Sequence, residues 1–401
     1  MKHVKAAFSR EAIRPFWWNV RALLEKTFGG PRPFGVNIAG HLSGEFGQAE
    51  SARCFIRALQ TTNIPYVLNN VVVSVHRNLD RTFQVFSDTN PYRVNLVHVT
   101  VDYARKFYKT RGWRYFRGRY NIGCWYWELP HFPRKWIPRF EPYQEIWVAS
   151  EYCAENIGKV SPIPVIKMTY PLFLDEEKIV GDRARFWLPE SSFMFLFFFD
   201  FYSAFDRKNP LGLIKAFQKA FSRNEDVVLV IKSINSHVDP ERVIRLKEAA
   251  RDLKVRFIHE HFTREEMLSL MATCHCFVSL HRSEGFGLGL AQAMYLGKPV
   301  IGTAWSGNMD FMNANNSFLV KYGLIEAAEG RWPYPQGSIW ADPDIDHAAE
   351  LMRLVYKNRE LGSEVGRRAS AEIKQKLKPA RTGIEISRRL QEVVRDGVQA
   401  E

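Results

Sequence analysis

The sequence is poor in cysteine and has no long apolar run. Its 401 residues include only five cysteines, at positions 54, 124, 153, 274 and 276. An odd, scattered set with no secretory leader before it argues against a disulfide framework, so we expect a reducing cytoplasmic compartment. No apolar stretch approaches the roughly 20 residues that a spanning helix needs, so we expect no transmembrane segment. Internal repeats and low-complexity tracts are also missing.

Acidic residues are fewer than basic ones, and the difference limits the choice of partner. The chain has 43 Asp and Glu against 56 Lys and Arg, which gives a formal net charge of +13. This charge favours an anionic partner. The basic residues are spread along the chain and no nucleic-acid-binding signature appears, so we expect no nucleic-acid partner. A phosphorylated ligand and an anionic membrane surface explain the positive net charge equally well.

Clusters of metal ligands are equally scarce. Residues 274–276 read Cys-His-Cys, but they begin an apolar strand and have no second cluster at zinc spacing, so we expect buried structural residues. Residues 259–261 read His-Glu-His on a loop without a further ligand. Residues 342–344 read Asp-Pro-Asp directly before a helical segment, where a helix cap is the simpler role. The sequence therefore predicts no metal site.

The first thirty residues form a basic amphipathic segment. They carry six basic side chains against two acidic ones, and apolar residues recur at helical spacing from Ile13 to Phe28 beside Trp17. A helix lying in a lipid interface would have this composition. A helix packed against the protein itself would fit as well, and the sequence leaves the two open.

The remaining chain is long enough for two α/β halves with separate cores. In the first half, strands are expected at 34–39, 66–68, 94–99 and 121–127, with a helix at 48–59. In the second half, strands are expected at 193–199, 227–231, 255–258, 276–280 and 300–303, with helices at 211–221, 345–356, 359–375 and 380–394. Alternation of this kind predicts mostly parallel sheets. We place the domains at residues 31–178 and 179–378, followed by a terminal segment at 379–401.

The most informative stretch runs from Val278 to Met312 and reads VSLHRSEGFGLGLAQAMYLGKPVIGTAWSGNMDFM. An apolar strand breaks here into a glycine-rich loop, which places Ser283 and Glu284 at the carboxyl edge of a sheet, where open α/β folds bind ligands. Gly285 and its neighbours let the backbone approach a ligand closely, and the helix that follows offers free N–H groups to a phosphate.

Two further segments place loop residues with a possible ligand role at strand ends. The loop after the first strand contains Gly44 and Gly47, which could hold a diphosphate, although any α/β domain begins with such a turn. In the second half, Arg207 and Lys208 stand just before a helix N-terminus, an unfavourable place for two cations without an anion.

The segment 121–157 is unusually aromatic. Trp125 and Trp147 lie inside strand-like runs and are expected in the core. Glu128 and His131 lie on a loop at a strand's carboxyl end, so we expect them to face the ligand site on the acceptor side.

The order Ser-Glu-Gly-Phe-Gly, short helix, Gly-Lys-Pro-Val-Ile and Ser-Gly-Asn resembles the donor-sugar site of the retaining glycosyltransferases of family GT4. The Trp-Glu-Leu and Glu-Ile-Trp blocks resemble the same family. The resemblance implies the GT-B fold, two Rossmann-like doubly wound domains facing across a cleft, with a C-terminal helix that returns to the first domain. Two positions depart from the family pattern: Gln292 stands where a second glutamate is usual, and Tyr202 stands where many members have an arginine.

The resemblance also implies roles for named residues. Lys208 and Arg207 would neutralise a donor diphosphate, and Glu284 would orient the donor sugar. The backbone from Gly285 through Phe286 and Gly287 to Leu288 would meet sugar and phosphate, while Gln292 would meet the ribose. His98, at the end of strand 94–99, is a candidate contact to the sugar or acceptor, and a core histidine is an equal alternative.

The activity implied is retaining transfer of a sugar from a nucleotide-sugar to a glycan or lipid-linked oligosaccharide, with no metal or other cofactor. GDP-mannose is the first choice of donor and UDP-sugars come next. A sugar-binding pseudoenzyme and a sugar-nucleotide epimerase are the alternatives. The basic segment 1–30 would suit a protein peripheral to the inner face of the plasma membrane.

Overall fold

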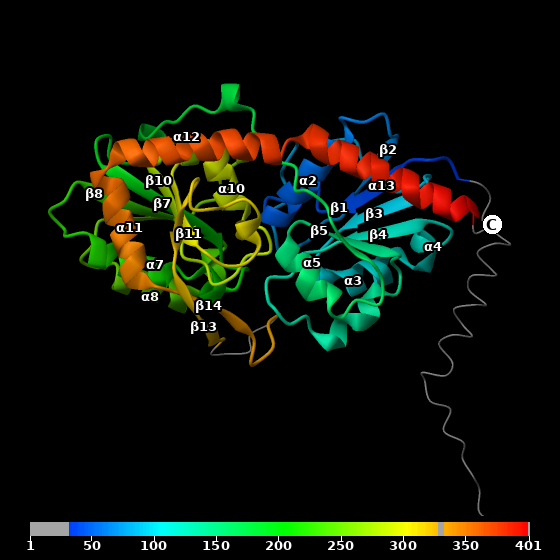
Figure 1. Ribbon diagram of the computed structural model, residues 1–401, viewed down its shortest axis with the longest axis horizontal. Coiled ribbons are helices and arrows are strands. Elements are labelled where there is room, and N and C mark those ends of the chain that lie inside the picture. Colours follow the sequence, from blue (N-terminus) through cyan, green and yellow to red (C-terminus); the bar gives the residue numbers. More distant parts are fainter. Residues whose placement is uncertain (1–31, 328–332, 400–401) are drawn as a thin grey trace, which may run out of the picture.

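The computed structural model describes residues 32–327 and 333–399, which form two α/β domains side by side (Figure 1). The predicted segment 1–30 lies outside the described residues. The first domain contains β1 (Val36–Gly40), α2 (Gly47–Leu59), β2 (Tyr66–Asn70), β3 (Val94–His98), α3 (Val101–Arg111), α4 (Trp113–Phe116), β4 (Tyr120–Cys124), the 3₁₀ helix η1 (Arg134–Phe140), β5 (Glu145–Val148), α5 (Glu151–Gly158) and β6 (Val165–Lys167).

The second domain begins after two short 3₁₀ helices, η2 (Glu176–Lys178) and η3 (Ala184–Phe186). It contains β7 (Phe193–Asp200), α6 (Phe205–Lys208), α7 (Pro210–Ala220), β8 (Val227–Ile234), η4 (Ser236–Val238), α8 (Pro240–Ala249), β9 (Val255–Ile258), α9 (Arg264–Thr273), β10 (Cys276–Ser279), α10 (Leu288–Tyr295), β11 (Val300–Thr303), η5 (Gly307–Asp310), β12 (Phe318–Val320), β13 (Tyr322–Glu326), β14 (Ile339–Pro343), α11 (Ile345–Lys357) and α12 (Arg359–Lys376). The last helix is α13 (Pro379–Gln399).

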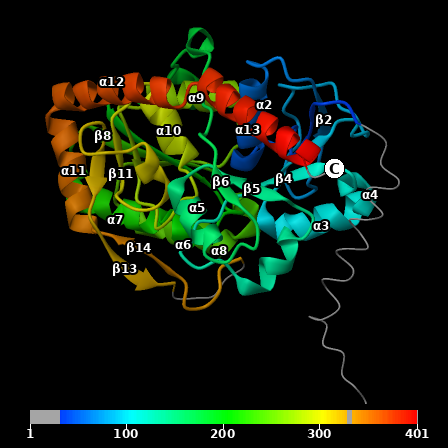
Figure 2. The same ribbon diagram turned by 45° about the vertical axis from the view of Figure 1, so that its right-hand side comes forward.

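Each domain is built on a six-stranded sheet in which all pairings are parallel. The strand orders are β2-β1-β3-β4-β5-β6 and β12-β11-β10-β7-β8-β9. Helices cover both faces, as expected for parallel sheets whose strands are buried on both sides (Figures 1 and 2). The α/β prediction with two Rossmann-like domains is therefore confirmed.

Strand β7 shows why the second sheet forms where the sequence predicts it. Its residues read FMFLFFFD, and six of the eight are buried. Phe195 and Phe197 pack into the cluster of apolar side chains on one face, while Met194 and Leu196 pack into the cluster on the other. Each such side chain contributes roughly 1.5–3 kcal/mol by leaving water, so a continuous apolar run is stable only at the centre of a covered sheet.

The aromatic segment fills the core of the first domain. Trp125 and Trp147 are 0% and 1% exposed, so their predicted core role is confirmed. Trp127 and Trp136 are equally buried and meet edge to face, with ring centroids 5.2 Å apart. The loop that carries Glu128 therefore begins from a rigid base.

The C-terminal helices connect the two domains. Helix α12 packs against α10 in the second domain, and α13 continues from it and packs against α2 in the first (Figure 1). The fully buried carboxylate of Glu145, at the start of β5, accepts hydrogen bonds from the guanidinium of Arg389 in α13 at 2.5 and 3.1 Å. The indole of Trp147 donates to the same carboxylate at 2.7 Å. This buried ion pair fixes α13 to the first sheet.

The antiparallel hairpin β13–β14 was not predicted. It stands apart from both parallel sheets, and the segment near its turn reaches the first domain. There the ring of Tyr334 lies 5.7 Å from that of Trp127, and both side chains are buried. The second domain thus covers part of the first domain's aromatic core.

The cysteines and the helix at Asp344 agree with the sequence. All five cysteines are buried and free. Asp344 caps α11, since its carboxylate accepts from the backbone N–H of His347 at 2.9 Å. Within residues 32–327 and 333–399, no helix combines the length and apolarity that crossing a bilayer requires.

Candidate functional site

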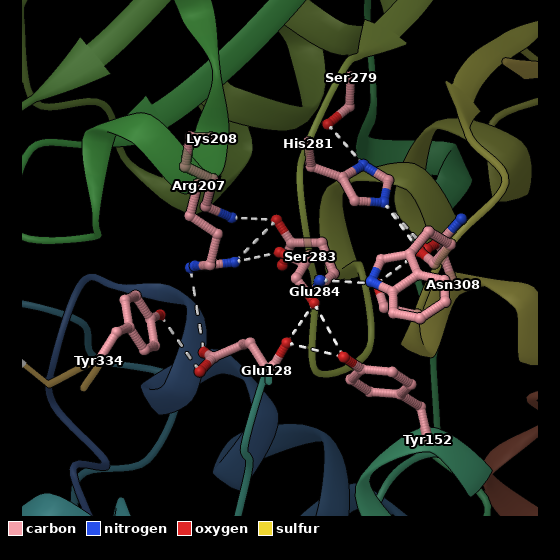
Figure 3. A network of polar contacts seen from close by, with 12 residues as sticks. Glu128, Tyr152, Arg207, Lys208, Ser279, His281, Ser283, Glu284, Asn308 and Tyr334 are labelled. Atoms are coloured by element: carbon pink, nitrogen blue, oxygen red, sulfur yellow. Dashed lines mark hydrogen bonds and ion pairs between the residues drawn. The ribbon is translucent and has the colours of Figure 1, made fainter. Parts of the chain in front are cut away.

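The centre of the candidate site is Glu284, on the loop that follows β10 (Figure 3). One of its carboxylate oxygens lies 2.5 Å from the ammonium of Lys208 and 3.3 Å from the guanidinium of Arg207. The carboxylate side chain is 13% exposed. Two strands that are adjacent in the sheet, β7 and β10, therefore bring three charged side chains together at one edge.

The two cations lie in the last turn of α6, directly before α7. Asn209 separates the helices in a left-handed conformation, and its side chain caps α7 by accepting from Gly212 N–H at 3.2 Å. The sequence predicted that cations in this position need an anion. The structure supplies Glu284 as one such anion, which offsets part of the positive charge of the two cations.

Arg207 is buried and holds the site together. Its side chain is 6% exposed, and its guanidinium donates to the backbone carbonyl of Ser283 at 2.7 Å. It also lies 3.9 Å from the carboxylate of Glu128 in the first domain. The hydroxyl of Tyr334 donates to the other oxygen of that carboxylate at 3.3 Å. Arg207 thus connects the Glu284 loop to the first domain, and its predicted grip on a diphosphate stays a prediction.

The charge state of Glu284 follows from these neighbours. Burial raises the pKa of this carboxyl, but Lys208 and Arg207 outweigh the burial and lower the pKa to about 2. Glu284 is therefore an anion at neutral pH and can only accept hydrogen bonds. Lys208, with 20% of its side chain exposed, uses one of its three N–H groups on Glu284. The others are available to a ligand.

A second loop, after β11, fixes the backbone of Glu284. The hydroxyl of Ser306 accepts from Glu284 N–H at 2.8 Å, and Gly307 N–H donates to the Glu284 carbonyl at 2.9 Å. A Cβ on Gly307 would collide with the carbonyl of Gly285, so this close approach requires glycine. The buried ring of His281 anchors the same loop through Asn308 Oδ1 at 3.0 Å. Because Asn308 Oδ1 only accepts, His281 carries its proton on Nε2.

The Glu284 loop also touches the first domain directly. The Ser150 hydroxyl donates to the Gly285 carbonyl at 2.6 Å, and the Ser283 hydroxyl donates to the Glu128 carbonyl. The ring of Phe286 stacks on that of Tyr170, with centroids 4.2 Å apart. The predicted donor loop therefore forms part of the contact between the domains.

His98 lies at the carboxyl end of β3 and is 1% exposed. Its Nε2 is 3.2 Å from the Ser51 hydroxyl, which also bonds the Tyr126 hydroxyl. Burial, with His41 nearby, lowers the pKa of His98 to about 3, so the ring is neutral at physiological pH. A Cβ on Gly285 would come within 3.4 Å of the Tyr126 side chain. His98 therefore reaches the Glu284 loop indirectly, through Tyr126 and through the rings of Phe55 and Tyr170.

Other predicted residues lie further from this centre. Gly44 is buried, and its carbonyl accepts from Arg53 at 2.7 Å, so it serves a packed turn. Gly47 is exposed at the start of α2. The side chain of His131 is exposed as well, while Gln292 is half-buried in α10. The proposed donor contacts of these residues stay predictions.

The backbone predicted to meet the donor lies at the start of α10. Gly287 has φ +92° and precedes Leu288, the first residue of that helix. A side chain at Gly287 would be strained in this left-handed conformation. The first N–H groups of α10 therefore begin next to Phe286, as the sequence predicted.

Sequence reasoning missed the residues that complete the contact between the domains. Tyr334 lies near the turn of an unpredicted hairpin, and Ser150 and Tyr126 lie in the aromatic segment, where neither was named as a site residue. The order of hydrophobic and polar residues gave no signal for Tyr334. For Ser150, the signal was available, because it directly follows the strand-like run Glu-Ile-Trp-Val and so had to lie at a carboxyl edge.

A cavity of about 660 Å³ adjoins the Glu284 loop on the side of β11. Residues of both domains line it, among them Pro130, Tyr152, Trp305, Asp310 and Tyr322. The Tyr152 hydroxyl lies 3.5 Å from that of Ser283. The cavity is large enough for a small ligand beside the charged cluster.

Comparison with known proteins identifies the second domain. Residues 196–372 match the family described as glycosyl transferases group 1. A trehalose synthase of Pyrococcus horikoshii is 23% identical over 338 residues, which cover 80% of this chain and 74% of that protein. A trehalose synthase of Thermococcus litoralis is 22% identical over 262 residues, and the match covers 62% of this chain and only 57% of that protein.

Solved structures agree on the fold. HepE of Anabaena, in complex with UDP and glucose, has a TM-score of 0.65 at 12% identity, covering 90% of this chain and all of that chain. Sucrose-phosphate synthase of Thermosynechococcus elongatus has the same TM-score and identity, covering 91% of this chain and all of that chain. Residues 196–372 therefore match the glycosyl transferases group 1 family, and the solved structures share the fold of the chain.

Proposed function

We propose that this protein transfers a sugar from a nucleotide-sugar donor to a glycan or lipid-linked glycan acceptor, with retention of configuration and without a metal. The observation that carries this proposal is the Lys208–Glu284–Arg207 cluster at the carboxyl edges of β7 and β10. An anion that only accepts hydrogen bonds suits sugar hydroxyls. A partly exposed ammonium beside it suits the diphosphate of the same donor.

In the proposed reaction, the bond between the sugar C1 and the diphosphate oxygen breaks and the acceptor oxygen bonds to C1. The acceptor's proton goes to the departing phosphate oxygen. Lys208 stabilises the negative charge that develops on the diphosphate, which is the main electrostatic demand of the step. Glu284 holds the sugar, while Ser306 and Gly307 hold Glu284. Catalysis then rests on positioning and charge stabilisation.

We further propose that the donor is a GDP- or UDP-sugar, with GDP-mannose as the first candidate from the sequence pattern around Glu284. HepE of Anabaena, whose structure holds UDP and glucose, supports testing UDP-sugars beside it. The cavity next to Ser283 supports an acceptor that enters on the Glu128 side. Its lining of aromatic rings and carboxylates is suited to a sugar's apolar face and hydroxyls.

A pseudoenzyme is the second candidate, because Gln292 replaces the glutamate that the family pattern places on α10. An amide can accept one hydrogen bond from a ribose diol and donate another, whereas a carboxylate accepts from both hydroxyls. We infer that this change retunes donor affinity and leaves the charged cluster able to act. The epimerase alternative has no paired acid and base in its favour.

The test is nucleotide release from GDP-, UDP- and ADP-sugars by the wild type, Glu284→Gln and Lys208→Met, with exposed Lys215→Met as the control. We expect one donor to be turned over, both cluster variants to lose at least 100-fold in kcat/KM, and the control to match the wild type. The anomeric configuration of the product, read by NMR, tests retention. Binding without turnover of any donor would favour the pseudoenzyme.

Localisation at the inner face of the plasma membrane is part of the proposal and rests on the composition of residues 1–30. Sedimentation with vesicles that contain anionic lipids, compared for the full chain and a chain without these residues, tests it. Equal sedimentation of the two would refute a membrane role for the segment.

A further inference from the structure

Lys232, near the carboxyl end of β8, is a buried lysine without an ion pair in the described part of the chain. It is 5% exposed, and no carboxylate among the described residues lies within 4.0 Å of its ammonium. Its ammonium lies over the ring of Phe262, 5.2 Å from the centroid. An uncompensated ammonium in the interior is costly, so its presence requires an explanation.

The acids around Lys232 already have other partners. Asp200, at the end of β7, accepts from Asn235 at 2.8 Å and from Tyr202 N–H at 2.9 Å. Glu266 accepts from Thr263 N–H at 2.7 Å as part of the cap of α9. These carboxylates and Glu260 influence Lys232 only from a distance. Among the described residues, no carboxylate is therefore paired with Lys232, and its ammonium can bond to a ligand.

The position of Lys232 in the sheet indicates which group that is. The second sheet runs in the order β10-β7-β8-β9, with Glu284 after β10 and Lys208 after β7. A donor whose sugar lies at Glu284 and whose diphosphate lies at Lys208 continues along the same edge over β8 and β9. Neighbouring strands are about 4.8 Å apart, so the edge over β8 and β9 has room for the nucleoside of the donor. Lys232 and Phe262 lie there.

Aromatic rings of both domains lie near the carboxyl end of β7, the strand next to β8. Phe46 and His76 are stacked with their centroids 4.1 Å apart, and the ring of Tyr202 meets His76 edge to face at 5.0 Å. His76 also lies 3.9 Å from Asp200, beside β8 in the sheet. Flat aromatic surfaces suit a nucleobase. A cation in the same place suits an oxygen on the edge of the base.

We propose that Lys232 donates a hydrogen bond to a keto oxygen of the donor's nucleobase and so selects uracil or guanine over cytosine or adenine. The inference rests on the proposed function and names the donor class for that site. Cytosine and adenine carry an amino group where uracil and guanine carry the oxygen. An ammonium that faces an amino group has no acceptor there and stays buried and unpaired.

The experiment measures the affinity of UDP, CDP, GDP and ADP by calorimetry, for the wild type and for Lys232→Met, which keeps the length and removes the charge. Within each ring size, we expect the wild type to bind the keto nucleotide about tenfold or more tightly than the amino nucleotide. Lys232→Met should abolish this preference and leave ADP and CDP affinity unchanged. Lys208→Met should weaken all four nucleotides alike, and Lys215→Met none.

The outcomes separate the two proposals. Binding of all four nucleotides with no keto preference, or an equal loss for all four in Lys232→Met, would assign Lys232 to the phosphates or to the fold and overturn the inference alone. Failure of the wild type to bind any of the four would refute the proposed function, and the nucleobase assignment would fall with it. A wild type without a keto preference would overturn the inference whether or not Lys232→Met folds.

Discussion

Replacing Lys232 by methionine should stabilise the protein, and the structure gives the size of the effect. Burial lowers the pKa of Lys232 from its ordinary 10.5 to about 8, against which the distant acids raise it. A shift of this size corresponds to about 3 kcal/mol of destabilisation at neutral pH. Methionine also loses the cation–π contact with Phe262, which reduces this gain in stability by roughly 1 kcal/mol. We expect Lys232→Met to raise the free energy of unfolding by about 2 kcal/mol at pH 7.

The pH dependence makes this prediction specific. The folded state releases the Lys232 proton near pH 8, while the unfolded chain keeps it until about pH 10.5. Between these values the unfolded state binds more protons, so the wild type gains stability as the pH rises. The advantage of Lys232→Met should therefore be complete below pH 8 and disappear toward pH 10.5. Calorimetric melting of the wild type, Lys232→Met and exposed Lys215→Met between pH 7 and 10 measures it.

The reasoning would be refuted by a variant that is less stable than the wild type at pH 7, because Lys232 would then have a partner in the fold. An advantage that does not change with pH would show that the apolar volume of methionine, and not the lost charge, is responsible. The control Lys215→Met should stay within about 0.5 kcal/mol of the wild type, with no trend in pH.

Three further predictions concern the site and its support. Gly307→Ala should lower kcat at least tenfold in a folded protein, because its Cβ would displace the Gly285 carbonyl; steady-state kinetics and circular dichroism check it. As the pH falls from 4.5 toward 2, the free energy of unfolding of the wild type should decrease by about 3 kcal/mol more than that of Glu284→Gln, since the folded pKa of Glu284 lies below its ordinary value. Unfolding free energies measured over this pH range check it, and equal slopes for the two proteins would contradict it. Glu145→Ala should cost about 1.5–3 kcal/mol and expose α13 to limited proteolysis, because Arg389 loses its charged hydrogen-bond partner in the first sheet.

The strands at the centre of the second sheet are the clearest predictions. Strands β7, β8, β10 and β11 lie within a few residues of the predicted positions, because their apolar runs are buried on both faces. Strand β6 was missed because its three residues are only half-buried. Strand β13 was missed because all five of its residues are exposed and no core dictates their pattern.

The candidate site was predictable to the level of strand edges. Glycine-rich breaks after apolar runs placed Glu284 and Lys208 at neighbouring carboxyl ends, and parallel strands then bring them together. What the breaks could not show is which cation is buried. Arg207 and Lys208 are adjacent in sequence, yet one lies under the loop at 6% exposure and the other stays accessible at 20%. That difference depends on how α6 turns into α7 at Asn209.

The remaining site residues could not be predicted because they belong to the contact between the two domains. Tyr334 and Glu128 are separated by 206 residues, and their contact exists only because a hairpin of the second domain lies on the first. Arg207 lies between Glu128 and Glu284, so the orientation of the proposed donor ligand depends on both domains. A site that one domain completes for the other is invisible to motif reasoning, which examines each segment alone. It follows that substitutions at Glu128 should affect the alignment of Glu284 more than the binding of nucleotide, because Lys208 and Lys232 lie entirely within the second domain.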